Sequence, residues 1–578
     1  MKTFYTAEKN TQILISLMKE HKVRKIVASP GSTNICFVAS VQQDPYFEMY
    51  SSIDERSAAY LACGLAAETG EPVAISCTGA TASRNYMPGL TEAYYRHLPV
   101  LAITSTQSIM RLGHNIPQII DRSIIPNDIA YLSVHLPAIH DDESEWNCNI
   151  KINKALLELK RKGGGPVHIN LTTEYTEDFS VKELPIVRKI ERITLNDTFP
   201  GLEKGKVAIF AGSYGKWNDE LTKAVDKFCE VNNSLVLCDH TSNYWGKYRV
   251  LPNALCGQAS YKASCRNIDT LIHIGEISGC YLSIFPKKVW RVHPDGELKD
   301  TFKKLSCVFE MRELDFFNYY ANQVNEKSDS YYNQWICECQ KIDSGIPELP
   351  FSNVWAAQKL SKQIPNDSVI HLGILNSLRS WNYFEITKGV NCYCNVGGFG
   401  IDGCLSSMIG ASFADRNKLF FGIIGDLAFF YDMNALGNRS ISNNIRLIIV
   451  NNGRGTEFRN SISWGSMFGE DTDEYISAAR HFGYQSRTLI RHYAEDLGFH
   501  YISASNKEEF LKNANIFVNP NITSKPIVFE LFTNPEDESN AIELIRNVGK
   551  STISSAKHMI KGIIGEKGTS KLKKITRI

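Results

Sequence analysis

The sequence predicts an α/β protein that contains three doubly wound parallel sheets, one in each of three domains. The main observation is that short apolar runs rich in β-branched residues alternate with helical patterns along most of the chain. This alternation is typical of parallel strands whose crossover helices cover both faces of a sheet. The second observation is that polar segments near residues 173–204 and 325–344 divide these runs into three groups.

The first group predicts a domain at residues 1–185. Four or five consecutive apolar residues are the expected length of a buried strand. The strand-like runs of this group are 25–29, 48–51, 73–77, 100–104 and 167–171. A helical pattern of small residues follows at 55–68, and a helix of this kind can pack very closely on its neighbours.

The second and third groups predict a central Rossmann-like domain at 190–345 and a further domain at 350–548. Their strand-like runs are 207–212, 235–238, 271–274, 289–292, 369–372, 419–424, 447–450 and 527–530. The remaining residues, 549–578, are rich in Lys, Gly and Ser. They predict a loosely ordered basic tail, and a surface anchor or a partner-docking segment is the alternative.

The composition excludes several classes of protein. The 63 Lys and Arg residues nearly balance the 62 Asp and Glu residues, and a net charge of +1 argues against a nucleic-acid partner. A hydrophobic content of 43% and a charged content of 22% exclude a disordered or coiled-coil protein. No apolar run approaches the roughly 18 to 20 residues of a membrane span, and the start lacks a signal-peptide core. A cytoplasmic protein without a transmembrane segment is therefore expected.

The cysteines predict reduced thiols rather than a disulfide framework or a zinc site. Fifteen cysteines occur in a long chain without secretory features, and most lie in apolar runs where Cys packs as a small hydrophobe. The pairs Cys337/Cys339 and Cys392/Cys394 are C-x-C motifs, but no second C-x-x-C or nearby histidine completes a zinc-binding set.

Two strand ends in the third group predict a metal site. Asp426 ends a nearly all-apolar run, and a buried carboxylate needs a compensating partner such as a cation. The next run ends in the turn Asn451-Asn452-Gly453, which supplies amide and carbonyl oxygens. Because adjacent parallel strands bring their ends together, these oxygens form a half shell suited to magnesium or calcium. The alternative is that Asp426 caps a helix at 428–437 and the asparagines form only a turn.

A glycine motif in the third group supports a competing interpretation. Residues 398–403 match G-x-G-x-x-G, and Asp426 follows about twenty residues later at a strand end. A nicotinamide- or flavin-dependent oxidoreductase requires this arrangement. A lone match is weak, however, and it explains neither the Asn451-Asn452 turn nor the first group.

The first group contains two further strand ends of interest. Glu55 begins the helix of small residues, where an acidic side chain commonly complements the helix dipole. The turn at 77–83 is rich in glycine and hydroxyl groups, and it either binds an anion or caps a helix. Neither feature identifies a reaction by itself.

Five segments, taken in order and with their spacing, resemble the thiamine diphosphate-dependent enzymes of the 2-oxo acid decarboxylase and acetolactate synthase type. They are Ser29-Pro30-Gly31-Ser32, Asp54-Glu55-Arg56, Gly400-Ile401-Asp402-Gly403, Gly425-Asp426-Leu427 and Val450-Asn451-Asn452. The resemblance covers about residues 5–548 and is most similar to the 2-succinyl-5-enolpyruvyl-6-hydroxy-3-cyclohexene-1-carboxylate synthases of menaquinone biosynthesis. It implies a pyrimidine-binding first domain and a diphosphate-binding third domain.

The resemblance implies roles for the residues of the metal site. Asp426 and Asn452 become side-chain ligands of Mg²⁺, the Arg454 carbonyl becomes a third ligand, and the metal bridges the cofactor diphosphate. Leu427 departs from the commoner glycine that follows the aspartate, a variation that the menaquinone enzymes share.

The resemblance also implies the other cofactor contacts. Glu55 corresponds to the glutamate that contacts the pyrimidine ring, and Ile401 to the bulky aliphatic residue that bends the cofactor. Asn376 and Ser377 occupy a loop that touches the diphosphate. The remaining implied contacts are Ser32, Thr78, Phe399, Gly425 and Leu427.

The reaction implied by this family is decarboxylation of a 2-oxo acid followed by carboligation of the enamine to an acceptor, both small molecules. Simple decarboxylation to an aldehyde is the alternative within the superfamily. Because the cofactor lies between two subunits in this superfamily, a homodimer or homotetramer is implied. A regulatory homologue without catalysis is a third class, and retention of Glu55, Asp426 and Asn452 argues against it.

The substrate-binding arginines of the menaquinone enzymes are absent. Their positions in S-P-G-S-R, N-S-x-x-x-R and N-R-G-x-x-G-I-D-G are occupied here by Thr33, Trp381 and Val396. Since arginine forks are the natural clamps for carboxylates, a different substrate pair is expected. The new polar candidates are Arg111, His114, Gln118, Arg379, Glu457 and Arg459, of which His114 and Gln118 are the predicted catalytic or substrate contacts beside Glu55.

Overall fold

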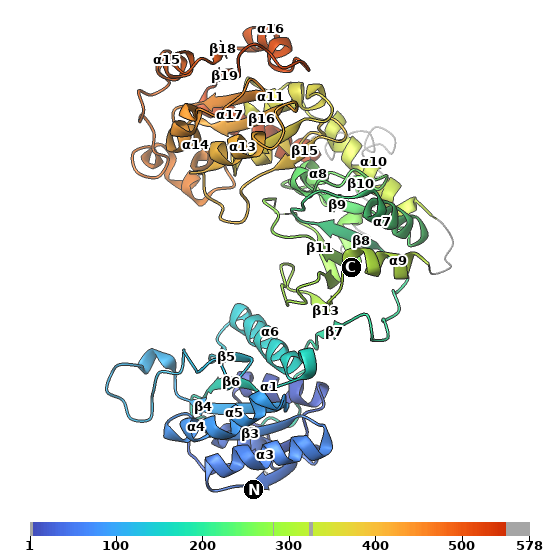
Figure 1. The fold of residues 1–578 in the computed structure, drawn as a ribbon, viewed down its shortest axis with the longest axis vertical. Coiled ribbons are helices and arrows are strands. Elements are labelled where there is room, and N and C mark those ends of the chain that lie inside the picture. Colours follow the sequence, from blue (N-terminus) through green and yellow to red (C-terminus); the bar gives the residue numbers. More distant parts are fainter. Residues whose placement is uncertain (1–3, 281, 323–327, 551–578) are drawn as a thin grey trace, which may run out of the picture. The chain divides into compact units, whose positions relative to one another are not determined.

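The computed structural model describes residues 4–280, 282–322 and 328–550, which form an α/β protein with three parallel sheets (Figure 1). This confirms the predicted fold class. The described residues divide into two compact units. One contains the chain up to Thr198 together with Gly296–Glu310, and the other contains Phe199–Asp295 and the chain from Met311 onward. The predicted boundaries of three domains stay predictions.

The first unit is built on a six-stranded parallel sheet with the order β2-β1-β3-β4-β6-β5. Its strands are β1 Lys25–Ala28, β2 Glu48–Ser51, β3 Val73–Thr78, β4 Val100–Thr106, β5 Leu132–Leu136 and β6 Val167–Thr172. Its helices are α1 Lys9–Glu20, α2 Ile35–Val41, α3 Glu55–Thr69, α4 Thr81–Asn85, α5 Met87–Tyr95 and α6 Asp142–Glu158, with the 3₁₀ turns η1 Ile109–Arg111 and η2 Arg161–Gly163. Two apolar clusters, one on each face, bury the sheet.

Helix α3 packs against α5 at the close distance that its small residues predict. Ala58, Ala59 and Ala62 are fully buried along one face of α3. A Cβ atom at Gly89 of α5 would lie only 2.4 Å from the Cβ of Ala59, so glycine is required at this crossing. This contact fixes the position of α3 and of the residue that begins it, Glu55.

The first unit also contains a short parallel pair, formed by β7 Glu191–Ile193 and β13 Leu305–Phe309. The predicted polar connection at 173–204 therefore includes a strand. The sequence did not predict β5, β7, β10, β13, β15 or β18 as strands.

The second unit contains two further parallel sheets. In the first of these the neighbours follow the order β10-β9-β8-β11-β12. Its strands are β8 Val207–Ala211, β9 Val236–Cys238, β10 Arg249–Val250, β11 Asn267–Ile274 and β12 Phe285–Val292. Its helices are α7 Asp219–Val231, α8 Asn253–Cys256, α9 Glu313–Ala321 and α10 Ser330–Ser344, with η3 His240–Ser242 and η4 Ser264–Arg266.

The last sheet of the chain has the order β15-β14-β16-β17-β19-β18. Its strands are β14 Val369–Leu372, β15 Asn391–Tyr393, β16 Phe420–Gly425, β17 Ile445–Asn451, β18 His500–Ala504 and β19 Ile527–Phe532. Its helices are α11 Asn353–Leu360, α12 Asn376–Trp381, α13 Cys404–Ser412, α14 Asp426–Asp432, α15 Leu489–Asp496, α16 Lys507–Phe517 and α17 Pro535–Arg546. The 3₁₀ segments are η5 Ser361–Gln363, η6 Met433–Gly437, η7 Thr456–Arg459 and η8 Trp464–Thr472. We call this part the C-terminal sheet domain.

Buried hydrogen bonds join the two sheets of the second unit. The backbone N–H of His240 donates to Asn382 Oδ1 at 2.8 Å, and the imidazole Nε2 of His240 lies 3.0 Å from the Trp381 carbonyl. The backbone N–H of Cys392 donates to Asn243 Oδ1 at 2.7 Å. Because the two His240 contacts hold the end of α12, they fix a helix that lies at the carboxyl edge of the C-terminal sheet domain.

All fifteen cysteines are free thiols, and most of them are buried. No helix among residues 4–280, 282–322 and 328–550 is both long enough and apolar enough to cross a membrane. The predicted basic tail falls outside the described residues from 551 onward.

Candidate functional site

Asp426 is a buried carboxylate at the end of β16. Only 4% of the Asp426 residue is exposed to solvent. Its Oδ1 accepts the N–H of Leu427 at 2.8 Å, and its Oδ2 accepts the N–H groups of Asn452 at 3.1 Å and Gly453 at 2.6 Å. Burial raises the pKa of Asp426 to about 6, and these backbone hydrogen bonds oppose the rise. Among the described residues no side-chain cation pairs with it, so the site favours an added positive charge.

The parallel pairing of β16 with β17 brings the two predicted halves of the site together. In this register Gly425 lies opposite Val450, so both strands end at the same edge of the sheet. Gly453 then adopts a φ of +75°, which turns the chain and directs two N–H groups at Asp426. The cap of α14 is Gly425 rather than Asp426, so a capping role does not account for the position of this carboxylate.

The two adjacent asparagines have different surroundings. Asn451 donates from Nδ2 to Glu530 Oε1 at 2.6 Å, which holds it inside the sheet. Asn452 is buried and its Oδ1 accepts the N–H of Arg454 at 3.3 Å, while the Arg454 carbonyl accepts the N–H of Thr456 at 3.0 Å. Each of these two carbonyl-type oxygens has a second lone pair left. Asp426, at the end of β16, and Asn452 and Arg454, in the turn after β17, therefore present three hard oxygen donors at one edge of the sheet.

A second buried acid lies near this turn. Glu538 on α17 is 5% exposed and accepts the N–H of Asn353 at 2.9 Å. Burial raises its pKa from the usual 4.5 to about 7, and the negative charge of Asp426 adds to the rise. Glu538 was not predicted from the sequence, because an acid in the first turn of a helix usually faces solvent.

Glu538 predicts a pH-dependent stability. The folded state binds the Glu538 proton more tightly than the unfolded state, so this carboxyl lowers stability as the pH rises from about 4.5 to 7. Without cofactor and with chelator present, Glu538→Gln should therefore gain stability over the wild type between pH 5 and pH 8, by about 3 kcal/mol at most. Thermal melts at the two pH values measure this difference, with Glu536→Gln, exposed on the same helix, as the control. A difference that does not change with pH would contradict the prediction.

The predicted diphosphate contacts Asn376 and Ser377 begin helix α12, so their assignment to a loop was wrong. The residue before them, Leu375, has a φ of +65°, a conformation that is uncommon for a branched side chain and that occurs at functional sites. Asn376 donates from Nδ2 to Thr456 Oγ1 at 2.9 Å. Ser377 Oγ accepts a hydrogen bond from Asn353 at 3.3 Å, which leaves its own hydroxyl hydrogen available.

The glycine motif at 398–403 forms a turn before α13. Strand β15 ends at Tyr393, so the motif does not follow its strand directly as a dinucleotide fingerprint requires. Phe399 has a φ of +58° and is partly exposed, and Ile401 is half-buried against the core of the C-terminal sheet domain. These features do not favour the oxidoreductase alternative.

In the first unit, Glu55 is half-buried at the start of α3. Its Oε2 accepts a hydrogen bond from Asn85 Nδ2 at 3.1 Å. The helix cap is the preceding residue, Asp54, which accepts the N–H of Arg56 at 3.2 Å and the hydroxyl of Ser57 at 2.9 Å. Because Asp54 satisfies the helix start, Glu55 is not needed as a cap.

The other predicted residues of the first unit lie at strand ends or in the following segments. Thr78 is half-buried at the end of β3, and Ser32 is exposed before α2. His114 and Gln118 are both exposed in the segment that follows η1, where Gln118 has a φ of +66°. Among the described residues no hydrogen bond or ion pair joins either side chain to Glu55, so their roles stay predictions.

Arg122 is a residue of this unit that the sequence did not reveal. It is 7% exposed and donates to the Gly79 carbonyl and to Asn170 Oδ1. Burial lowers its pKa to about 10. It ties the segment that carries Gln118 to the turn after Thr78. An arginine in a polar segment gives no signal of burial, which explains the omission.

The positions that lack the family's arginines are all buried in local packing. Thr33 donates to the Ser105 carbonyl at 2.7 Å, and Trp381 donates from Nε1 to Asn353 Oδ1 at 3.3 Å. Val396 is 6% exposed. Three of the new polar candidates are already paired, because Arg379 binds Glu457 and Arg459 binds Asp473.

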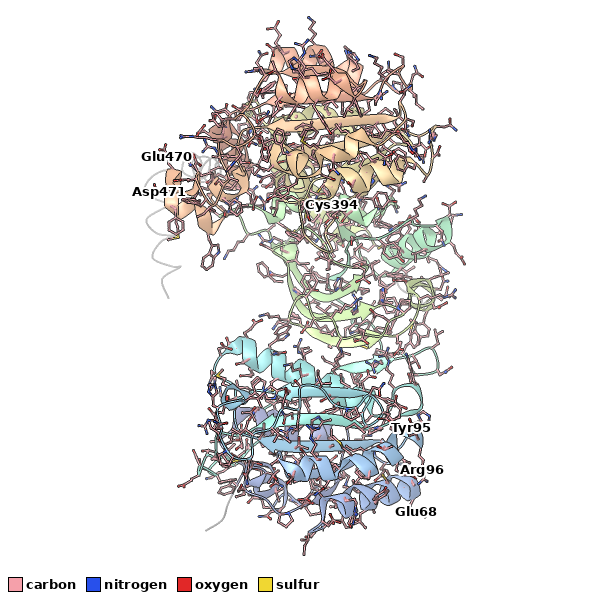
Figure 2. The ribbon with its side chains drawn as sticks, turned by 60° about the vertical axis from the view of Figure 1, so that its left-hand side comes forward. Glu68, Tyr95, Arg96, Cys394, Glu470 and Asp471 are labelled. Atoms are coloured by element: carbon pink, nitrogen blue, oxygen red, sulfur yellow. The ribbon has the colours of Figure 1, made fainter. Side chains whose placement is uncertain are left out.

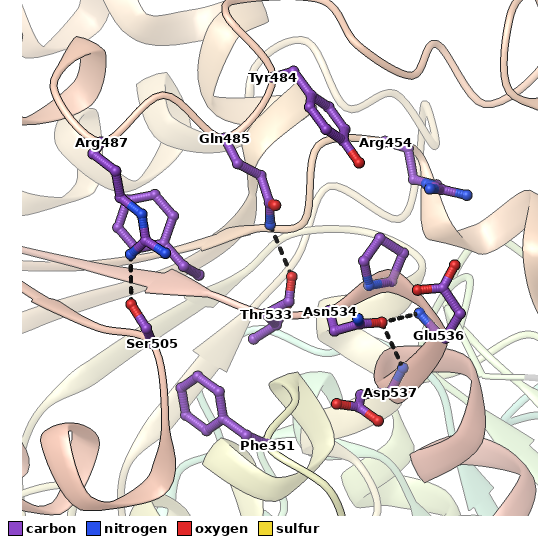
Figure 3. Close-up of a pocket in the computed structure, with 12 residues that line it drawn as sticks. Phe351, Arg454, Tyr484, Gln485, Arg487, Ser505, Thr533, Asn534, Glu536 and Asp537 are labelled. Carbon is purple, nitrogen blue, oxygen red and sulfur yellow. Dashed lines mark hydrogen bonds between the residues drawn. The ribbon is translucent and has the colours of Figure 1, made fainter.

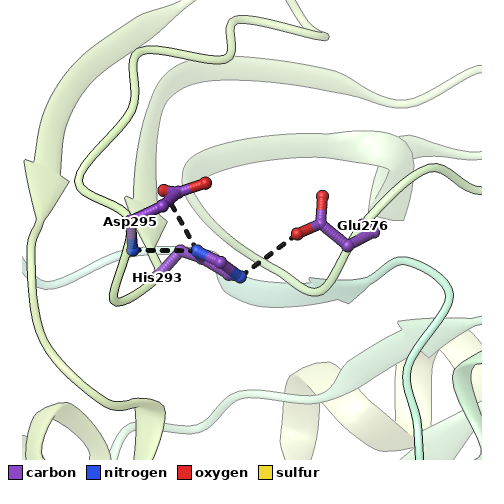
Figure 4. A group of neighbouring side chains, drawn as sticks. All are labelled: Glu276, His293 and Asp295. Carbon is purple, nitrogen blue, oxygen red and sulfur yellow. Dashed lines mark hydrogen bonds and ion pairs between the residues drawn. The ribbon is translucent and has the colours of Figure 1, made fainter.

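Two other groups of polar residues are present, and the first shares Arg454 with the turn beside Asp426. A cavity of about 400 Å³ beside the end of β19 is lined by Arg454, Arg487, Glu536 and Asp537 among others, so its charges are mixed (Figure 3). In the other sheet of this unit, His293 lies 3.2 Å from Glu276 and 3.0 Å from Asp295 (Figure 4). The His293 Nδ1 also accepts the N–H of Asp295 at 3.1 Å, so hydrogen bonds account for this cluster.

The segment after Asn452 exposes large apolar side chains. In η8, Trp464 is 90% and Met467 is 77% exposed, and Tyr475 beyond it is 85% exposed. Figure 2 shows Glu470 and Asp471 of the same segment at the periphery of the C-terminal sheet domain. A surface of this kind is typical of a region that contacts another molecule.

Comparisons with known proteins show which proteins the chain is similar to. A family model described as "Thiamine pyrophosphate enzyme, N-terminal TPP binding domain" matches residues 9–125. The chain is 30% identical over 562 residues to a 2-succinyl-5-enolpyruvyl-6-hydroxy-3-cyclohexene-1-carboxylate synthase of Bacteroides thetaiotaomicron, which covers 93% of this chain and 98% of that protein. The synthase of the same name from Phocaeicola vulgatus is 30% identical over 566 residues with equal coverage. A solved thiamine diphosphate-dependent 4-hydroxybenzoylformate decarboxylase from Rhodococcus jostii RHA1 is similar with a TM-score of 0.40 and 16% identity, covering 91% of this chain and 99% of that chain.

Proposed function

Because the chain belongs to the family of thiamine diphosphate-dependent enzymes that includes the 2-succinyl-5-enolpyruvyl-6-hydroxy-3-cyclohexene-1-carboxylate synthases, we propose that it decarboxylates a 2-oxo acid and ligates the product to an acceptor. Thiamine diphosphate and Mg²⁺ are the cofactors of this proposal. The observation that carries it is the buried Asp426 carboxylate hydrogen-bonded to the Asn452 turn. That turn lies at the carboxyl edge of a parallel sheet, where ligands of such sheets bind.

The oxygen donors around Asp426 fit a hard divalent cation. Mg²⁺ prefers carboxylate, amide and carbonyl oxygens together with phosphate oxygens and water. A cation at Asp426, Asn452 and the Arg454 carbonyl would offset the desolvation that raises the pKa of Asp426. The free donor hydrogens of Asn376 and Ser377 suit diphosphate oxygens. The further contacts that we propose on this side are Phe399, Ile401, Gly425 and Leu427.

Glu55 suits the pyrimidine side of the cofactor. When bound, thiamine diphosphate supplies the carbon nucleophile that attacks a 2-oxo acid and the electron sink for loss of carbon dioxide. Glu55 would hold a proton at a ring nitrogen of the aminopyrimidine, which makes the adjacent amino group easier to deprotonate. The hydrogen bond from Asn85 fixes the carboxyl group for this task. Ser32 and Thr78 are the other proposed contacts of this half, and His114 and Gln118 the proposed substrate contacts.

A homodimer or homotetramer is part of the proposal. Both units expose large apolar side chains close to the proposed cofactor contacts. Tyr60 and Leu61 on α3 are 47% and 50% exposed, and Trp464 lies in the segment after Asn452. Burial of such side chains between subunits is a common source of association free energy.

The choice of donor 2-oxo acid tests the substrate expectation of this proposal. Thr33, Trp381 and Val396 stand in place of three arginines, each of which contributes on the order of 1.5 to 3 kcal/mol to the binding of a carboxylate. Turnover of 2-oxoglutarate with isochorismate should therefore be about four or more orders of magnitude lower than in an enzyme that has these arginines. Pyruvate has no second carboxylate that an arginine must bind, so it should be consumed. Carbon dioxide release and product mass, measured for both donors, check this expectation. Efficient formation of the menaquinone intermediate would contradict it, and an aldehyde product would favour simple decarboxylation over ligation.

A further inference from the structure

Arg379 and Glu457 form a bidentate ion pair in the C-terminal sheet domain. Arg379 Nη1 lies 2.6 Å from Glu457 Oε2, and Nη2 lies 3.0 Å from Oε1. The side chains are 26% and 17% exposed, so solvent screens the pair only in part. A fork of this geometry is the one that arginine offers to a carboxylate of a ligand. Here the protein's own glutamate occupies it.

The pair lies at the same sheet edge as the proposed diphosphate contacts. Arg379 is on α12, which follows β14, and Glu457 is on η7, which follows β17. Arg379 Nη1 also donates to Asn376 Oδ1 at 3.2 Å, and Asn376 in turn donates to Thr456 Oγ1. The guanidinium is therefore one hydrogen bond away from a residue that we assign to the cofactor, within reach of a molecule bound beside it.

Two other arginines of this edge are in a different situation. Arg454 and Arg459 both contact Asp473 Oδ1 at 3.0 Å, and these contacts involve one oxygen atom rather than a fork. Neither arginine bonds to a proposed diphosphate residue. Arg379 is the arginine whose release from its partner would place a fork beside Asn376.

We propose that Glu457 determines donor specificity by withholding Arg379 from a second carboxylate on the substrate. This inference rests on the proposed function and names its substrate class as 2-oxo acids without a distal carboxylate. A dicarboxylic donor would have to displace Glu457 from a preorganised pair, and Glu457 would repel it. A donor with a neutral side chain meets neither obstacle.

The test compares Glu457→Gln with the wild type as purified enzymes loaded with thiamine diphosphate and Mg²⁺. Glutamine keeps the size and one acceptor oxygen but removes the charge. Initial rates of carbon dioxide release are measured for pyruvate, 2-oxobutyrate and 2-oxoglutarate. The ratio of kcat/KM for 2-oxoglutarate to that for pyruvate should rise by about 10- to 100-fold, mainly through a lower KM for 2-oxoglutarate.

Two further variants isolate the role of the freed guanidinium. In the double variant Arg379→Met with Glu457→Gln the gain should disappear. The matched control is Glu385→Gln, which removes a glutamate charge from an arginine pair of the same unit, Arg249–Glu385 at 3.2 Å, and should leave the ratio unchanged. If Glu457→Gln loses its melting transition, Glu457→Ser carries the same expectation.

The outcomes separate this inference from the proposed function. An unchanged ratio in a folded Glu457→Gln variant that still consumes pyruvate would overturn the role of Glu457 and leave the proposed function standing. An equal gain in the double variant would overturn the role of Arg379. Absence of carbon dioxide release from every donor, in the wild type and in all variants, would overturn the proposed function and this inference with it.

Discussion

Replacement of Asp426 by alanine is expected to abolish the binding of thiamine diphosphate, and the wild type is expected to bind the cofactor only with a divalent cation. The carboxylate is buried and hydrogen-bonded by three backbone N–H groups, so it is fixed in the position where a cation would bind. Without that cation the negative diphosphate would face the charge of Asp426 directly. The substitution and the removal of the cation should each lower the affinity for thiamine diphosphate more than a thousandfold, since one buried charge contact of this kind is worth several kcal/mol.

Titration calorimetry with Mg²⁺ and with chelator measures the effect. Asp432→Ala is the matched control, because Asp432 is a buried aspartate of the same helix that accepts hydrogen bonds from Ser406 instead. It should lower the melting temperature and leave cofactor affinity close to that of the wild type. Equal affinity with and without chelator, or tight binding of a nicotinamide cofactor, would refute the assignment.

Replacement of Glu55 by glutamine should slow proton–deuterium exchange at the thiazolium carbon of bound cofactor by orders of magnitude, while the fold and cofactor binding persist. Glutamine can still accept the hydrogen bond from Asn85, but it cannot move a proton to the aminopyrimidine. The helix start should survive, because Asp54 provides the cap.

Exchange measured by nuclear magnetic resonance after acid quench reports this step before any substrate is involved. Glu68→Gln is the control on the same helix, and Figure 2 shows Glu68 among the surface side chains of the first unit. An unchanged exchange rate in Glu55→Gln would remove Glu55 from the mechanism.

The sequence predicted the central strands of each sheet well because burial on both faces leaves a continuous apolar run. Strands β4 and β17 are buried at every position and were predicted almost to their ends. The edge strands β15 and β18 have mixed burial, and nothing in their sequences separates them from loops. Edge strand β2 was predicted although its residues are half-buried or exposed.

The candidate site was predictable where it depends on strand ends and less so where it depends on side-chain pairing. The meeting of Asp426 with Asn452 follows from the adjacency of two parallel strands. The pairing of Arg379 with Glu457 joins residues far apart in the chain, and no local sequence pattern predicts it. The burial of Arg122 and Glu538 likewise depends on tertiary packing, so both residues look like ordinary surface charges in the sequence.

The contact between Gly89 and Ala59 limits how this protein can vary. A methyl group at position 89 would collide with α3. Because α3 begins at Glu55, a substitution of Gly89 would displace Glu55, which we assign to the cofactor, although Gly89 itself is not a proposed ligand contact. Random libraries made to change the donor will therefore contain inactive members whose defect lies in this helix crossing rather than in the pocket. Keeping residue 89 fixed as glycine, while varying the edge that carries Glu457, confines the search to changes that the scaffold tolerates.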